Sequence, residues 1–203
     1  MKTKLTAALA GVLAISSFFA QQAGAKPSEQ DIKGVVQDVA TLDELVKDIT
    51  PAETAAVVLR VIKSIDASRM SDAEKKRAIA MVVARAVAYK PEQAAEMIVE
   101  LVSIMKNDAL LPTVAAAAVI AAEGNSTAVI DALTARFKND KALLQVINDA
   151  ANEPAGPLTP PVVKDIQDMV REMRLAAVPL VPAQEPTTAP LVPPLVGGKY
   201  EGQ

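Results

Sequence analysis

The sequence predicts an all-α protein of about eight helices, arranged as antiparallel helix pairs and followed by an irregular proline-rich C-terminal tail. Three observations lead to this prediction. Apolar residues recur at the spacing of three and four residues that is typical of helices, with charged residues on the opposite face. Start and stop signals divide residues 28–175 into segments of helical length. No segment alternates apolar and polar residues for long enough to predict a strand.

Residues 1–25 have the features of a secretory signal peptide. Lys2 and Lys4 precede an apolar run that ends at Ala20, and a small-residue cleavage site, Ala23-Gly24-Ala25, follows. We therefore expect a bacterial protein that is exported to the periplasm or secreted. A buried or membrane-anchoring helix is the alternative, but the run is shorter than the roughly 20 predominantly apolar residues of a membrane span.

The remaining chain divides into a helical domain, residues 26–176, and a proline-rich tail, residues 177–203. Capping boxes of the form Ser/Thr-x-x-Glu predict helix starts at Thr41–Glu44, Thr50–Glu53 and Ser71–Glu74. Further boundaries are indicated by Pro51, Pro91, Pro112, Pro160 and the stretch Gly124-Asn125-Ser126-Thr127. Asn125-Ser126-Thr127 also fits a glycosylation signal, but a helix cap explains the same residues.

A sequence echo indicates a repeated unit. The segment IMKND at residues 104–108 returns as RFKND at residues 136–140, and a shift of 32 residues aligns 81–108 with 113–140 at 9 of 28 identical positions. Units of 32 to 40 residues with two helices each are typical of helical solenoids. We predict four units, roughly 41–66, 71–108, 109–140 and 141–175. An irregular bundle of alanine- and valine-rich helices is the alternative, and no named repeat consensus fits.

The tail is rich in proline and in branched apolar residues. Six of the 14 prolines lie between residues 179 and 194, and the segment PLVP occurs twice. Such a segment cannot be helical and samples polyproline II. The candidate partner-docking residues are Pro179, Leu180, Val181, Pro182, Pro190, Leu191, Val192 and Pro193. The tail could instead pack along a groove of its own domain or remain unstructured.

The residue types argue against catalysis. The chain has no histidine and no cysteine, which removes the usual general base, the thiolate nucleophile and nearly every zinc site. We therefore predict no catalytic residues, no cofactor-binding residues, no cofactor and no metal site. A carboxylate hydrolase using Glu96 and Glu100, which share a helix face, is a minor alternative.

Charge and composition also narrow the choice of partners. Without the two lysines of the signal, the chain has 19 basic and 24 acidic residues, which gives a formal charge of −5. Only three aromatic residues remain after residue 25. Nucleic-acid binding needs a cationic face, so we expect no nucleic-acid partner. We also expect no membrane span in the mature chain, because its most apolar window is short and suits a buried helix.

These observations together favour an exported, non-enzymatic interaction or scaffold protein. In this hypothesis a helical-repeat body carries the proline-rich docking tail. The expected partner is a protein, which the sequence does not identify. The alternative is a periplasmic carrier or chaperone that binds apolar ligands in a helical groove. Six methionines after residue 25, most of them at apolar helical positions, would suit such a groove as well as a plain core.

Overall fold

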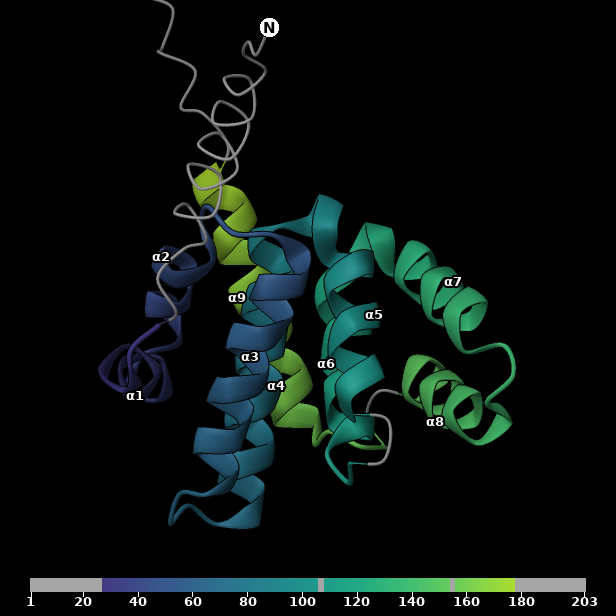
Figure 1. Cartoon of the computed structure of the whole chain (residues 1–203), viewed down its shortest axis with the longest axis horizontal. Coiled ribbons are helices and arrows are strands. Elements are labelled where there is room, and N and C mark those ends of the chain that lie inside the picture. The colour runs from purple at the N-terminus through teal and green to yellow at the C-terminus, as the bar shows by residue number, and fades with distance from the viewer. Residues whose placement is uncertain (1–26, 106–107, 154–155, 178–203) are drawn as a thin grey trace, which may run out of the picture.

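The computed structural model describes residues 27–105, 108–153 and 156–177, and these residues form helices and turns without a strand (Figure 1). Eight helices have nine or more residues: α1 (Glu29–Gln37), α3 (Pro51–Asp66), α4 (Asp72–Tyr89), α5 (Ala94–Met105), α6 (Leu111–Ala122), α7 (Ser126–Phe137), α8 (Lys141–Asn152) and α9 (Pro160–Ala177). The shorter elements are α2 (Leu42–Val46) and the 3-10 turns η2 (Val39–Thr41), η3 (Pro91–Gln93) and η4 (Glu123–Asn125). The predicted all-α class is confirmed.

The helices form an ordered array in which each helix from α1 to α6 packs against the one two places further along the chain. One layer consists of α1, α3, α5 and α7, and a second consists of α2, α4, α6 and α8. Consecutive helices from α2 to α8 also contact each other, and Figure 1 shows the pairs α3/α4, α5/α6 and α7/α8 following one another across the molecule. This order is that of a short solenoid.

The sequence echo corresponds to one step of the array, from α5 to α7. A shift of 32 residues moves η3 and α5, residues 91–105, onto residues 123–137, which are η4 and α7. The predicted fourth unit, residues 141–175, departs from the repeat. Its second helix, α9, packs against α4 and α6 and forms a third layer instead of extending the layer of α7. The array therefore ends at α8.

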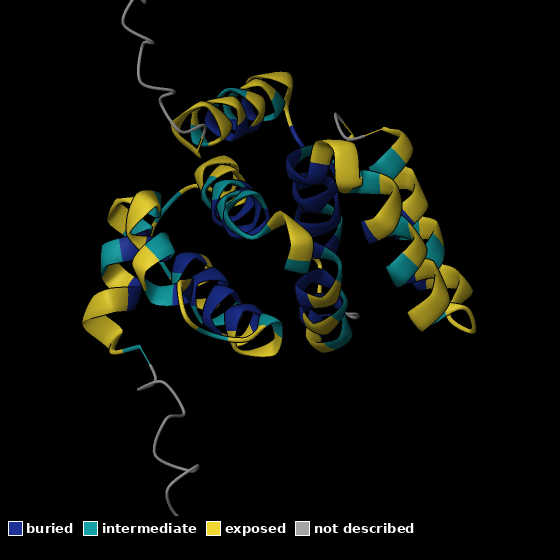
Figure 2. Cartoon of the chain, turned by 90° about the horizontal axis from the view of Figure 1, so that it is seen from above, coloured by how far each residue is buried: buried dark blue, intermediate teal, exposed yellow. Residues whose placement is uncertain are grey.

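Helix α6 lies at the centre of the structure. It contacts α4, α5, α7, α8 and α9, and ten of its twelve residues are buried. Four consecutive alanines, residues 115–118, let the neighbouring helices approach closely. Figure 2 shows the buried residues on the sides of the helices that face one another.

The segment that contains α6 is unusually apolar. Among the described residues, one stretch of 27 residues, Leu111–Phe137, is long and apolar enough to cross a membrane. The stretch consists of two helices, α6 and α7, which η4 separates. Half of its most apolar window is buried in the protein, as in the core helix of a helical domain.

Capping interactions begin several helices where the sequence predicts them. Thr50 with Glu53 starts α3, and Ser71 with Glu74 starts α4, each with both capping-box hydrogen bonds. The backbone amide and hydroxyl of Thr50 lower the pKa of Glu53. The hydroxyl and the backbone amide of Ser71 lower the pKa of Glu74.

Two further capping positions differ from the prediction. The box at Thr41–Glu44 is wrong, because Thr41 lies within η2 and its hydroxyl donates to the carbonyl of Asp38 at 2.8 Å. A box that the prediction missed, Ser28 with Asp31, begins α1 and lowers the pKa of Asp31 through the Ser28 hydroxyl and amide. Here an aspartate occupies the position that glutamate usually takes.

Ion pairs attach the peripheral helices to the central ones. Asp43 on α2 accepts two hydrogen bonds from Arg85 on α4, at 2.8 and 2.5 Å, and this pair holds the pKa of Arg85 above its ordinary value. Two ion pairs connect α9 to the rest of the structure. Asp165 pairs with Arg77 of α4 at 2.9 Å, and near the end of α9 an arginine, Arg174, pairs with Glu123 of η4.

Candidate functional site

The predicted docking residues lie outside the described residues. They are Pro179, Leu180, Val181, Pro182, Pro190, Leu191, Val192 and Pro193, and the predicted signal peptide, residues 1–25, is also outside. The described chain ends at Ala177 in the last turn of α9, where the side chain of Leu175 is 69% exposed. The other strongly exposed large apolar side chain in the described part is Ile104, at 55%.

The carboxylate pair considered for hydrolysis lies on the surface. Glu96 and Glu100 are both exposed on α5. No group of three or more acidic residues that could hold a metal ion occurs in residues 27–105, 108–153 and 156–177. The methionines Met97, Met105 and Met169 are buried in the core.

A depression in the described surface lies beside the turn that joins α7 to α8. It measures about 690 Å³ and is lined by Ser103, Arg136, Phe137, Asn139, Asp140 and Lys141. Five of these residues belong to the second copy of the echo, RFKND, and to the residue that follows it. Ser103 of α5 forms the opposite wall, because α5 packs on α7 in the same layer.

Local hydrogen bonds determine the shape of the turn. The amide of Asp140 donates to the carbonyl of Phe137 at 2.8 Å and closes the end of α7. The Asp140 carboxylate then accepts from the amide of Leu143 at 3.1 Å and caps α8. In the first copy of the echo, Asp108 accepts from the amide of Leu110 at 2.8 Å. In both copies, therefore, the aspartate stabilises a turn before the next helix.

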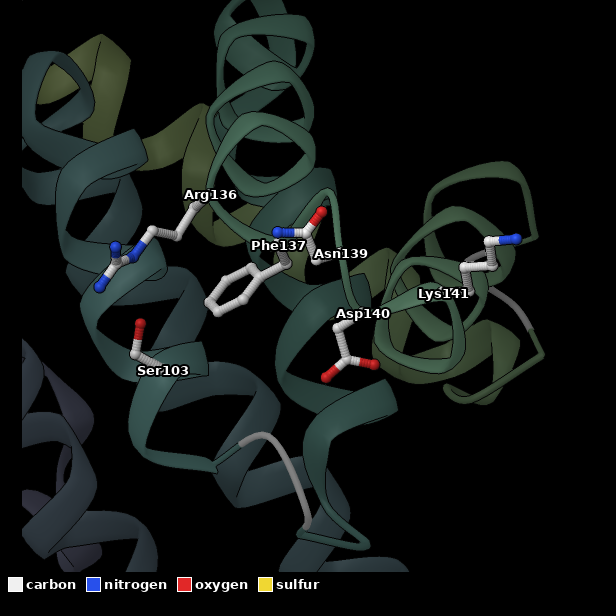
Figure 3. Close-up of a pocket in the computed structure, with 6 residues that line it drawn as sticks. All are labelled: Ser103, Arg136, Phe137, Asn139, Asp140 and Lys141. Carbon is white, nitrogen blue, oxygen red and sulfur yellow. The ribbon is translucent and has the colours of Figure 1, made fainter.

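The side chains around the depression offer several kinds of contact. Figure 3 shows Arg136 and Phe137 extending toward Ser103, whereas Lys141 points away from them. Arg136 is exposed, and Phe137 is partly buried against the core and offers part of its ring to the depression. The Ser103 hydroxyl donates to the carbonyl of Val99 at 2.8 Å. The depression thus combines a guanidinium, an aromatic surface and the amide of Asn139.

The prediction from sequence did not single out these residues as a site. The echo that contains four of them predicts only a repeated unit. A signal was present, however, because Phe137 is the only phenylalanine after residue 25 and replaces Met105 of the first copy. Buried Met105 and partly exposed Phe137 occupy equivalent positions in the repeat.

Comparison of the chain with models of protein families, with curated proteins and with solved structures finds no match.

Proposed function

We propose that the protein is an exported, non-enzymatic interaction protein, in which the helix-pair array is a rigid body and residues 177–203 form a docking tail. The observation that carries this proposal is the array itself. Stacked helix pairs make a stable body that presents side chains from successive units along one surface, a form used for binding other proteins. The depression beside the α7–α8 turn is the candidate contact point on this body.

The chemistry of the depression indicates the kind of segment it would take. Arg136 offers a fork of N–H donors that suits a carboxylate, and Phe137 offers an aromatic surface for an apolar side chain. Arginine and aromatic residues, phenylalanine among them, are also enriched at protein interfaces. The partner segment we propose therefore carries an acidic residue close to an apolar one.

Site-specific photo-crosslinking in the producing cell tests this contact. A photoreactive residue at Asn139, in the full-length protein, is expected to form one discrete protein adduct that disappears with Arg136→Glu. The matched control is Lys138→Glu, because Lys138 is exposed in the same turn and does not line the depression. If Lys138→Glu removes the adduct equally, or if the same adduct forms from exposed Gln145 of α8, the depression is not the contact point.

The role of the tail needs a separate experiment. Partner capture with residues 26–203 and with residues 26–177 is expected to differ, because the second lacks both PLVP segments. Identical partner sets would exclude a docking role for the tail. Native mass spectrometry of protein from its own compartment completes the test, since a tightly held lipid would favour a carrier of apolar ligands instead.

A further inference from the structure

A second depression, between α1 and α3, gathers positive charge. It measures about 280 Å³ and is lined by Glu29, Ile32, Lys33, Arg60, Lys63 and Ser64. Helices α1 and α3 contact each other in the first layer of the array. Ile32 is only 5% exposed, and so the depression has an apolar residue at its base and charged residues around it.

The cations come from both helices. Lys33 is on α1, whereas Arg60 and Lys63 are three residues apart on α3 and therefore share one face of that helix. Glu29 is the single acidic residue in the lining. The lining thus holds three positive charges and one negative charge, on a chain with fewer basic than acidic residues overall.

Glu29 balances only part of this positive charge. None of the three cations forms an ion pair with a carboxylate in residues 27–105, 108–153 and 156–177. Arg60 is also held in place, because its Nη1 donates to the carbonyl of Pro27 at 2.8 Å. That bond leaves the other guanidinium N–H groups available, since arginine has five donors. Like charges held close together repel one another, and a bound anion relieves the repulsion.

We propose that this depression is a binding site for a phosphate-type oxyanion. Lys33 and Lys63 supply ammonium groups from opposite walls, Arg60 supplies directed N–H donors, and the Ser64 hydroxyl supplies a further donor. The excess of two positive charges matches the charge of a phosphate dianion. The phosphate could belong to a free molecule or to the headgroup of an anionic lipid, and the experiment separates these sources.

The experiment uses the complete mature chain with isotope-labelled backbone amides. Inorganic phosphate is titrated at a constant ionic strength of about 0.1 M while NMR follows the amides of Lys33 and Ser64. Sulfate and acetate are titrated in the same way. Sedimentation with phosphatidylglycerol vesicles, and with phosphatidylcholine vesicles as the neutral comparison, tests the lipid source.

The variant Lys33→Glu/Lys63→Glu is compared with the charge-matched control Lys47→Glu/Lys76→Glu, whose lysines are exposed and line no part of this depression. We expect saturable shifts at both amides, and binding about tenfold weaker or worse in the first variant but nearly unchanged in the control. Vesicle binding that free phosphate competes away would indicate a lipid headgroup, whereas phosphate binding without vesicle binding would indicate a free ligand.

Three results would overturn the proposal: shifts that do not saturate, equal weakening in the control variant, or acetate binding as tightly as phosphate. Far-UV circular dichroism establishes that both variants are folded. If the first variant fails to fold, the wild-type titrations alone decide, because a specific site must still saturate with phosphate and discriminate against acetate.

Discussion

Replacing Asp43 by alanine removes both hydrogen bonds that attach α2 to Arg85 on α4. The two side chains are 20% and 18% exposed, and the hydrogen bonds measure 2.8 and 2.5 Å. The arginine stays charged and largely buried after the change, since its pKa is far above neutral pH. Stability is therefore lost through an unpaired guanidinium as well as through the missing contacts.

The exposure of the pair determines the expected magnitude. Removing one partner of a fully buried pair costs about 3–5 kcal/mol, whereas an exposed pair contributes about 0.2–1 kcal/mol. At one fifth exposure, water can partly rehydrate Arg85, so we expect Asp43→Ala to cost about 2 kcal/mol. The comparison pair, Arg77 with Asp165, is 61% and 35% exposed, and there Arg77→Ala should cost about 0.5 kcal/mol.

Urea unfolding followed by far-UV circular dichroism measures both changes. With a slope of about 2 kcal/mol per molar urea, Asp43→Ala should lower the midpoint by about 1 M and leave the slope unchanged. A double-mutant cycle with Arg85→Ala isolates the coupling between the two residues. If Asp43→Ala costs no more than Arg77→Ala, burial does not decide the strength of these ion pairs, and the reasoning is wrong.

Three further predictions concern capping, backbone strain and helix packing. Because the pKa of Glu53 and that of Glu74 are lowered in the folded state, the stability they contribute is complete above the unfolded pKa and is lost as the pH falls below about 4.3. The double variant with glutamine at both positions should therefore lose less melting temperature on acidification than the wild type, and an equal loss would contradict this account. Glu123 has a φ of 37°, a backbone conformation that strains a residue with a side chain. In a protein that already carries Arg174→Ala, so that no ion pair is lost, Glu123→Gly should therefore stabilise the fold by about 1 kcal/mol. Destabilisation in urea unfolding would argue against strain. Ala116→Leu places a large side chain at a fully buried position of α6 and should cost about 1–3 kcal/mol or more by thermal unfolding, whereas a neutral result would mean that the helices can separate there.

The capping signals show how far local sequence predicts structure. Thr50 and Ser71 behave as expected, because each box lies within four consecutive residues and needs no distant contact. Thr41 has the same signature but serves another turn, since Asp38 three residues earlier already caps η2. Competing local signals are therefore the main source of error at helix starts.

The turn after α6 shows a different kind of failure. The sequence places the residue best suited to a positive φ at Gly124, but the structure has its positive φ at Glu123, and no described glycine has one. Glu123 pairs with Arg174 of α9, more than fifty residues later in the chain. Local sequence patterns do not predict an ion pair between residues so far apart in the chain.

The sequence alone predicted the helical class, several helix starts and the 32-residue relation between α5 and α7, because these depend on spacing and caps within short segments. Tertiary structure alone decided that α9 returns to α4 and α6. It also decided that Phe137 meets Ser103 in one depression and that Lys33 meets Arg60 in another. These contacts depend on how the side chains of one helix pack against those of another helix. The packed helices come from distant parts of the chain, so local sequence does not predict which faces meet.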